Sequence, residues 1–241
     1  MVALTETERK GPASQRYMFH GLPLTVLVIA AVCILVELVL FAADTGMWAD
    51  RSLRSKVYVL GAFWKPLLLD SQPLFAAQPV TMFGTYAFLH GGVIHMAVNM
   101  VALLSFGTAI VNRVGQKRFL VVYAVSALGG AVGFGLFSES GAPMVGASGA
   151  LFGLLGVWIC WDYLDRRYHG DPLWVTLRAL VFLVAYNLVF WLLLQGQLAW
   201  ETHFGGFVAG WLLAVFWGRS VLDQSRRRRG LARRTSSAQG T

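Results

Sequence analysis

Six apolar runs divide the chain, and each is about long enough to cross a lipid bilayer as a helix. A hydrocarbon core roughly 30 Å thick requires about 20 apolar residues in helical conformation. The runs cover residues 22–43, 92–111, 119–137, 146–164, 179–195 and 202–217. Their connections are short, apart from a long first loop over about residues 44–90. The pattern predicts an all-α membrane protein with one six-helix domain over residues 21–219.

The composition agrees with a membrane protein. Hydrophobic residues make up 56% of the 241 positions and charged residues 13%, and the mean hydropathy is +0.60, which is too apolar for a soluble domain of this length. Residues 1–20 are polar and mix acidic with basic side chains, unlike a cleaved signal peptide. We therefore expect the first run to remain in the mature protein, and we expect the basic, Ser-containing tail over residues 220–241 to be disordered.

The basic residues predict an orientation. Four of the twenty Lys and Arg residues lie in the long first loop, and the other sixteen lie at the same side of the predicted bundle. The positive-inside rule makes that side cytoplasmic, so both termini face the cytoplasm and the second, fourth and sixth runs begin at the outer face. A net charge of +8 beside membrane spans suits anionic lipid headgroups better than nucleic acid, which we do not expect as a partner.

Strongly polar side chains lie near the outer ends of those three runs. They are His90, His95 and Asn99 at the second, Ser148 at the fourth and His203 at the sixth. Ionisable or strongly polar groups are costly within a membrane and usually face a bundle interior or a wet cavity. Three helices that bring such residues to one depth therefore predict a functional site.

Ser148 lies in a glycine-rich stretch, Gly146-Ala147-Ser148-Gly149, where a loop becomes a helix. Glycine permits close approach of the backbone, and the free N–H groups of a helix N-terminus favour a developing oxyanion. Both features suit a nucleophilic serine. The structural alternative is a serine that caps the helix.

His203 is the candidate general base. Glycine pairs four residues apart follow both candidates: Gly149 and Gly153 on the fourth run, and Gly206 and Gly210 on the sixth. Two smooth faces of this kind allow helices to pack backbone to backbone, which would bring Ser148 and His203 within hydrogen-bond reach. The alternative is a histidine that anchors the sixth span at the interface.

His95 and Asn99 are spaced i, i+4 and so project from one helical face as possible oxyanion donors. A zinc site that also uses His90 is an alternative, but no acidic base accompanies it. The two cysteines, Cys33 and Cys160, lie inside apolar runs and suggest neither a disulfide nor a metal cluster. We expect no metal and no cofactor.

Three ordered motifs resemble those of the rhomboid family of intramembrane serine proteases, in its bacterial six-span form. The stretch TYAFLHGGVIHMAVNM over residues 85–100 is similar to the segment that enters the second helix of the family. The string GASGALFG from Gly146 resembles the nucleophile motif, and HFGGFVAG from His203 resembles the motif of the last helix. The resemblance extends from the first run to residue 217.

The resemblance implies a role for each candidate residue. It makes Ser148 the nucleophile and His203 the base of a dyad without Asp, with His95, Asn99 and the Ser148 backbone N–H in the oxyanion hole. It gives His90 a structural role. Phe152 stands where many relatives have a Tyr that packs against the catalytic His. The first loop has Trp64-Lys65 in place of the Trp-Arg pair of many relatives, and Glu37 in the first run has no assigned role.

The expected function is therefore hydrolysis of peptide bonds in or near the outer end of single-pass transmembrane substrates. The resemblance places the protein among the lipids of a bacterial cytoplasmic membrane, with its active site near the outer face. It also points to the fifth run, rich in Phe190, Trp191 and Leu192, as a lateral gate, although these residues suit simple lipid contact equally well. One alternative is an inactive, derlin-like protein that binds membrane helices. Another is a proton or ion transporter, for which inverted repeats and an acidic relay are missing from the sequence.

Overall fold

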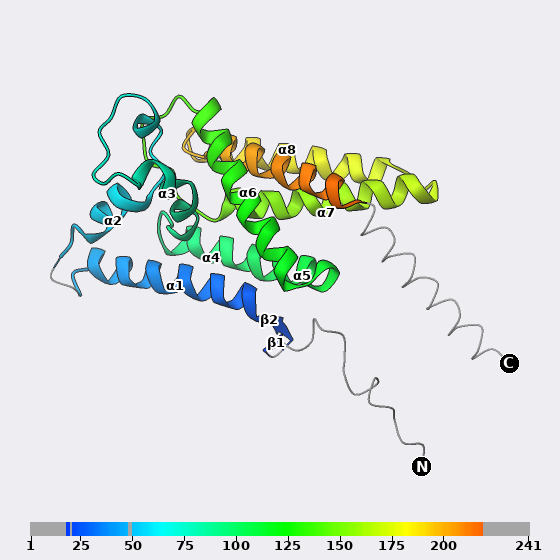
Figure 1. Cartoon of the computed structure of the whole chain (residues 1–241), viewed down its shortest axis with the longest axis horizontal. Helices are drawn as coiled ribbons and strands as arrows, with labels where there is room; N and C mark the ends of the chain where they lie inside the picture. Colours follow the sequence, from blue (N-terminus) through cyan, green and yellow to red (C-terminus); the bar gives the residue numbers. More distant parts are fainter. Residues whose placement is uncertain (1–17, 20, 48–49, 219–241) are drawn as a thin grey trace, which may run out of the picture.

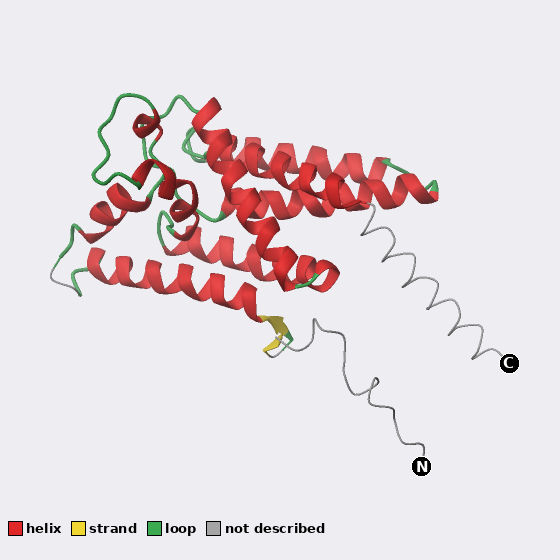
Figure 2. Ribbon diagram, in the orientation of Figure 1, coloured by secondary structure: helices red, strands yellow, loops and turns green. Residues whose placement is uncertain are grey.

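The computed structural model describes residues 18–19, 21–47 and 50–218, and nearly all of its regular structure is helical (Figures 1 and 2). The long helices are α1 (Leu24–Asp44), α4 (Val93–Ala102) continued by η4 (Leu103–Gly107) and α5 (Thr108–Val114), α6 (Gln116–Phe137), α7 (Ser148–His169) and α8 (Trp174–Leu193). A last helix, orange in Figure 1, covers residues 200–218. The predicted N-terminal segment, apart from residues 18 and 19, and the predicted basic tail lie outside the described residues.

Four of these helices are long and apolar enough to cross a membrane: α1, the continuous helix Val93–Val114, α6 and α8. The chain is a multi-pass membrane protein, as its apolar runs predicted. The fourth and sixth runs correspond to α7 and the last helix, which are not among these four; α7 carries two Asp and two Arg in its last two turns. The helix ends differ from the predicted run ends by up to five residues. The count of six spans stays a prediction.

The first long loop contains short elements that the apolar pattern did not predict. They are α2 (Leu53–Gly61), η2 (Lys65–Leu68), α3 (Gln78–Thr85) and η3 (Tyr86–Phe88). These helices have nine residues or fewer, so they leave no signal on the scale of a membrane span. A two-stranded antiparallel ribbon, β1 (Met18–Phe19) with β2 (Leu22–Pro23), precedes α1 and is the small exception to the all-α prediction.

Helix α7 lies at the centre of the bundle. It packs against α4, η4, α6 and α8 and buries eleven of its 22 residues. Helix α8 differs sharply, because of its residues, all of which the structure describes, Thr176 alone is buried. The long first loop gathers at one end of the bundle, on the left in Figure 1.

Candidate active site

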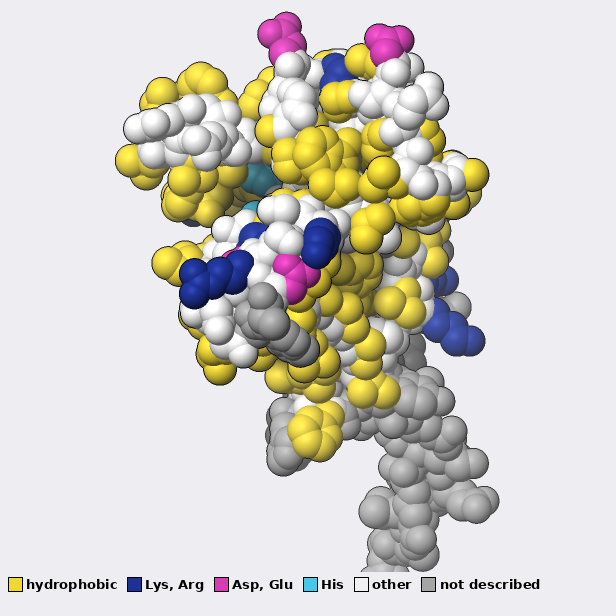
Figure 3. Space-filling model, turned by 90° about the vertical axis from the view of Figure 1, so that its left-hand side faces the viewer, with side chains coloured by type: hydrophobic (Ala, Val, Ile, Leu, Met, Phe, Trp, Pro, Cys, Tyr) yellow, Lys and Arg dark blue, Asp and Glu magenta, His cyan; other side chains and the backbone are white. Residues whose placement is uncertain are grey.

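Three helices begin at the same end of the bundle, where α2 and α3 also lie (Figure 1). They are α4, α7 and the last helix, and they carry His95, Ser148 and His203 within their first turns. Figure 3 views this end, and a histidine side chain is visible at the bottom of a recess in the surface. The end at which these three helices begin is called the site end below.

Glycines bring α7 and the last helix into backbone contact. A Cβ atom added to Gly206 would overlap the carbonyl oxygen of Gly149, and one added to Gly210 would overlap that of Gly153. Any side chain at these positions would therefore force the helices apart. The contact joins the first two turns of α7 to the second and third turns of the last helix, next to the first turns that carry Ser148 and His203.

The ring of His203 stacks on Phe152 of α7. The two ring centroids lie 4.0 Å apart and the planes differ by 5°, and His203 is 6% exposed. Ser148 precedes Phe152 by four residues, so both side chains project from the same face of α7. The stack thus holds the imidazole one helical turn from the serine, on the serine's face of the helix.

Asn187 of α8 contacts the same imidazole at its Nδ1 edge. Its Oδ1 lies 2.6 Å from His203 Nδ1. The Asn187 amide group donates in turn to the carbonyl of Leu183, at 3.0 Å. Sequence reasoning did not select Asn187, although a polar residue inside an apolar run is itself a signal of a functional site.

His95 of α4 lies beside the serine, across Gly146. Gly146 has a φ of +130°, and a Cβ atom added there would lie 2.9 Å from His95 Cε1, 3.1 Å from His95 Nε2 and 3.8 Å from Ser148 Oγ. A side chain at this position would be strained and would press on the imidazole. The bare backbone of Gly146 therefore lets His95 sit beside the serine.

Hydrogen bonds define the protonation of His95. The backbone N–H of Gly91 donates to His95 Nδ1 at 3.2 Å, so in the neutral imidazole the proton is on Nε2, the atom that faces Gly146. Asn99 is buried and donates from Nδ2 to the His95 carbonyl at 2.9 Å. Its amide group has a second hydrogen that this bond does not use.

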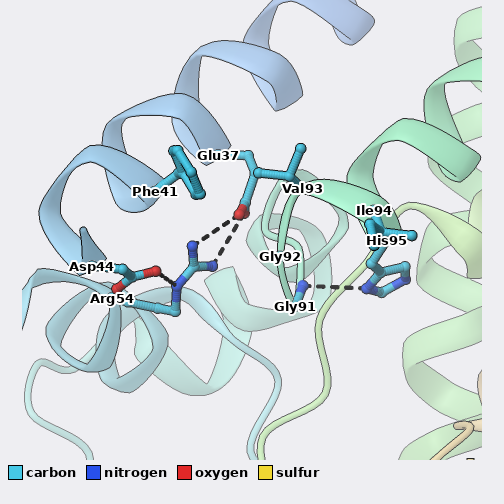
Figure 4. Close-up of a pocket in the computed structure, with 9 residues that line it drawn as sticks. All are labelled: Glu37, Phe41, Asp44, Arg54, Gly91, Gly92, Val93, Ile94 and His95. Atoms are coloured by element: carbon cyan, nitrogen blue, oxygen red, sulfur yellow. Dashed lines mark hydrogen bonds and ion pairs between the residues drawn. The ribbon is translucent and has the colours of Figure 1, made fainter.

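A charged cluster holds the loop that carries Gly91. Arg54 of α2 donates to both carboxylate oxygens of Glu37 in α1, at 2.8 and 3.1 Å, and to Asp44 at 2.6 Å. It also donates to the carbonyl of His90 at 3.0 Å. Figure 4 shows Glu37, Asp44 and Arg54 around a cavity of about 500 Å³ that His95 also lines. Pairing with Glu37 raises the pKa of Arg54 above its ordinary value, so the guanidinium remains charged.

Tyr58 and Tyr86 complete the support of the two loops that flank the serine. The Tyr58 hydroxyl donates to the His90 carbonyl at 2.5 Å. The Tyr86 hydroxyl donates to Ala127 of α6 at 2.7 Å, and the Tyr86 carbonyl accepts from the Gly146 N–H at 3.0 Å. The segments before His95 and before Ser148 are therefore both held by side chains or backbone of the first loop.

His90 lies beneath His95, fully buried, with the ring centroids 5.4 Å apart. Burial lowers the pKa of His90 to about 4, and the nearby His95 adds to the shift. Within the described residues, no three His, Cys, Asp or Glu side chains are grouped so that they could hold a metal ion. The structural role that the resemblance implied for His90 stays a prediction.

Comparison with known proteins identifies the family. The family model of the Rhomboid domain matches residues 77–220, more than half of the chain. The chain belongs to the rhomboid family. RHOMBOID-like protein 1 of Arabidopsis thaliana is 34% identical over 145 residues, which are 60% of this chain and 36% of that protein. Rhomboid-type serine protease 2 of Emericella nidulans is 34% identical over a segment that covers 61% of this chain and 28% of that protein. Rhomboid protease GluP of Bacillus subtilis is 31% identical over a segment that covers 54% of this chain and 24% of that protein.

The matched segments span about a quarter to a third of these three rhomboids, so the similarity covers only part of each of those proteins. The match to the family model shows the family. These relatives come from a plant, a fungus and a bacterium, so the bacterial six-span type stays a prediction. The family match begins at residue 77 and leaves out α1 and α2, the two helices that supply Glu37 and Arg54.

Proposed function

We propose that this rhomboid is an intramembrane serine endopeptidase that hydrolyses peptide bonds in or near the outer end of substrate transmembrane helices. The observation that carries the proposal is the set of groups held near Ser148 by three helices. His95 lies beside it across Gly146, and His203 lies one turn away on Phe152. Two of the matched relatives are named as proteases, which supports the same chemistry here.

In the proposed reaction His203 takes the proton of the Ser148 hydroxyl while the serine oxygen attacks the substrate carbonyl. The protonated imidazole then gives its proton to the leaving amine, and the C–N bond breaks. An acyl group remains on Ser148 and is released by a water molecule that His203 activates in the same way. The stack on Phe152 keeps the imidazole in position through both half reactions.

The oxyanion of the tetrahedral intermediate needs donors that are already in place. His95 supplies Nε2–H, because its Nδ1 accepts from Gly91. Asn99 supplies the amide hydrogen that its bond to the His95 carbonyl leaves free. The backbone N–H of Ser148 is among the first four of α7, which have no partner within the helix.

The proposal includes a direction and a route for the substrate. The asymmetry of basic residues supports cytoplasmic termini, which put the site end at the outer face of a bacterial cytoplasmic membrane. The exposed helix α8 borders His203 and is the proposed route of lateral access for single-pass proteins. Replacing Phe190 and Trp191 of α8 by Ala should then raise turnover, and unchanged turnover in a folded variant would contradict this route.

The test uses the purified full chain in detergent with a single-pass membrane protein as substrate. Ser148→Ala should lower cleavage by about 1,000-fold or more. The matched control is Ser105→Ala, which removes an exposed hydroxyl from η4. A fluorophosphonate that reacts with activated serines should label the wild type and Ser105→Ala but not Ser148→Ala. Equal cleavage by the wild type and Ser148→Ala would overturn the mechanism.

The second candidate function is a derlin-like protein that binds membrane helices without cutting them. The exposed face of α8 would suit such binding. The same experiment separates the two functions, because a binding protein would retain the substrate while neither cleaving it nor reacting with the fluorophosphonate.

A further inference from the structure

Asn187 is a polar residue within one of the helices that are apolar enough to cross a membrane. The side chain is half-buried and turns toward the last helix, where its Oδ1 lies 2.6 Å from His203 Nδ1. Among the described residues, α8 makes two side-chain hydrogen bonds to other elements. One is Thr176 to Asp162 of α7, at 2.7 Å, and the other is the contact with His203.

The orientation of the Asn187 amide follows from its second contact. The Leu183 carbonyl can only accept a hydrogen bond, so the atom 3.0 Å from it must be the NH2 group of Asn187. The atom that faces His203 is then the amide oxygen, which also can only accept. His203 must therefore carry a proton on Nδ1, and a neutral imidazole with Nδ1–H leaves Nε2 free to accept another proton.

We propose that Asn187 is a positioning residue that completes a Ser148–His203–Asn187 arrangement drawn from three helices. It holds the tautomer and the ring plane in which His203 can act as a base. The inference rests on the proposed function and adds a third group to the dyad. During the attack the Ser148 proton moves to Nε2, the serine oxygen bonds to the carbonyl carbon, and Asn187 keeps accepting from Nδ1–H without taking the proton.

The neutral amide suits this position better than a carboxylate would. A carboxylate within an apolar helix would have to be desolvated beside lipid, whereas an amide supplies an acceptor oxygen without a full charge. The aromatic face of Phe152 holds the plane of the imidazole, and Asn187 holds its Nδ1 edge through the 2.6 Å contact. The two contacts are complementary, because stacking orients the ring plane but does not select which nitrogen carries the proton.

The decisive comparison is between Asn187→Leu, which keeps the volume and removes the acceptor, and Asn187→Asp, which restores an oxygen at the same place. The control is Leu188→Ala, a truncation at an exposed position of the same helix. We expect Asn187→Leu to lower kcat about 10-fold at an unchanged KM, with an equal fall in the rate of fluorophosphonate labelling. Asn187→Asp should regain most of this loss, and Leu188→Ala should stay within about twofold of the wild type.

A spectroscopic measurement tests the same inference without turnover. In protein labelled with 15N-histidine, the His203 side chain should show a proton on Nδ1 in the wild type and a mixture of tautomers in Asn187→Leu. The proposal is overturned if Asn187→Leu matches the wild type in kcat and in the tautomer of His203. It is also overturned if Asn187→Leu and Asn187→Asp lower kcat equally. A wild type that neither cleaves nor reacts with the fluorophosphonate would instead defeat the proposed function, and the tautomer would still report on Asn187.

Discussion

The two sides of Ser148 are built in different ways. On the His95 side, the first loop encloses the site with a charged cluster in which Arg54 joins Glu37, Asp44 and the His90 carbonyl. On the His203 side, the imidazole rests on one aromatic ring of α7 and one amide of α8. The first side is a network that ties together α1, α2 and the start of α4, and the second is a pair of contacts.

The difference matches what each side has to do in the proposed reaction. Oxyanion donors help most when they are fixed before the charge develops, since then no reorganisation is needed. The base passes one proton from the serine to the leaving group, and two contacts are enough to hold its ring for this step. In addition, α8 has the fewest buried residues of the long helices, so substrate can approach on the side of the base without disturbing the oxyanion donors. We infer that rigidity is concentrated on the His95 side.

The largest effect should come from breaking the charged cluster. Glu37 is 1% exposed and the Arg54 side chain 19%, and removing one member of a buried pair costs about 3 kcal/mol. Glu37→Gln should therefore lower the free energy of unfolding by about that amount. It should also reduce kcat, because the carbonyl of His90 loses a fixed donor and the adjoining Gly91 N–H no longer orients His95. Unfolding in detergent and steady-state cleavage check both effects.

The matched control is the second ion pair of the same loop. Lys56 and Asp50 are 2.7 Å apart but largely exposed, so Asp50→Asn should leave the melting temperature and the cleavage rate unchanged. If Glu37→Gln and Asp50→Asn behave alike, the charged cluster is a surface feature, and the contrast between the two sides of the site is wrong.

This contrast also shows what the sequence could predict. Apolar runs located the long helices because membrane spans are a local property of about 20 residues. The glycine pairs near Ser148 and His203 predicted closely packed helices, because the positions of glycines are known from the sequence alone. Both signals are contained in short stretches of chain.

The supporting contacts were not predictable in the same way. Glu37 was visible as a charge in an apolar run. Its partner Arg54 lies 17 residues further along the chain, in a loop whose short helices lack the long apolar run that marks a membrane span. Asn187 faces His203 only because of the rotation of α8, which depends on packing rather than on spacing. The tautomers of His95 and His203 follow from hydrogen bonds to Gly91 and Asn187 that exist only in the folded chain.

A smaller effect is expected from acid, through the buried His90 on the His95 side. The ordinary pKa of His is about 6.5, and burial lowers that of His90 to about 4. Below pH 6.5 the unfolded chain binds a proton that folded His90 excludes, so stability is lost as the pH falls from about 6.5 to 4. At pH 5 the loss is on the order of 2 kcal/mol. Unfolding at pH 7 and pH 5 measures it.

His90→Gln should reduce the difference between the two pH values by about this amount, because Gln does not titrate and the other buried histidines keep their own contributions. The control is His169→Gln at the far end of α7, where the imidazole is about a third exposed and the pH dependence should persist. An unchanged pH dependence in His90→Gln would show that acid acts elsewhere in the molecule.

The smallest effect concerns the aromatic contact on the side of the base. Phe152→Leu keeps a large apolar side chain, so the free energy of unfolding should fall by less than about 1.5 kcal/mol. It removes the flat face on which His203 stacks, a contact worth about 1 kcal/mol, and kcat should fall about fivefold. Phe152→Tyr keeps the ring and should retain wild-type kcat. Phe137→Ala, which alters an exposed aromatic pair with Phe204, serves as the control. If Phe152→Leu cleaves as fast as the wild type, Asn187 alone orients the base, and the His203 side depends on a single contact from α8.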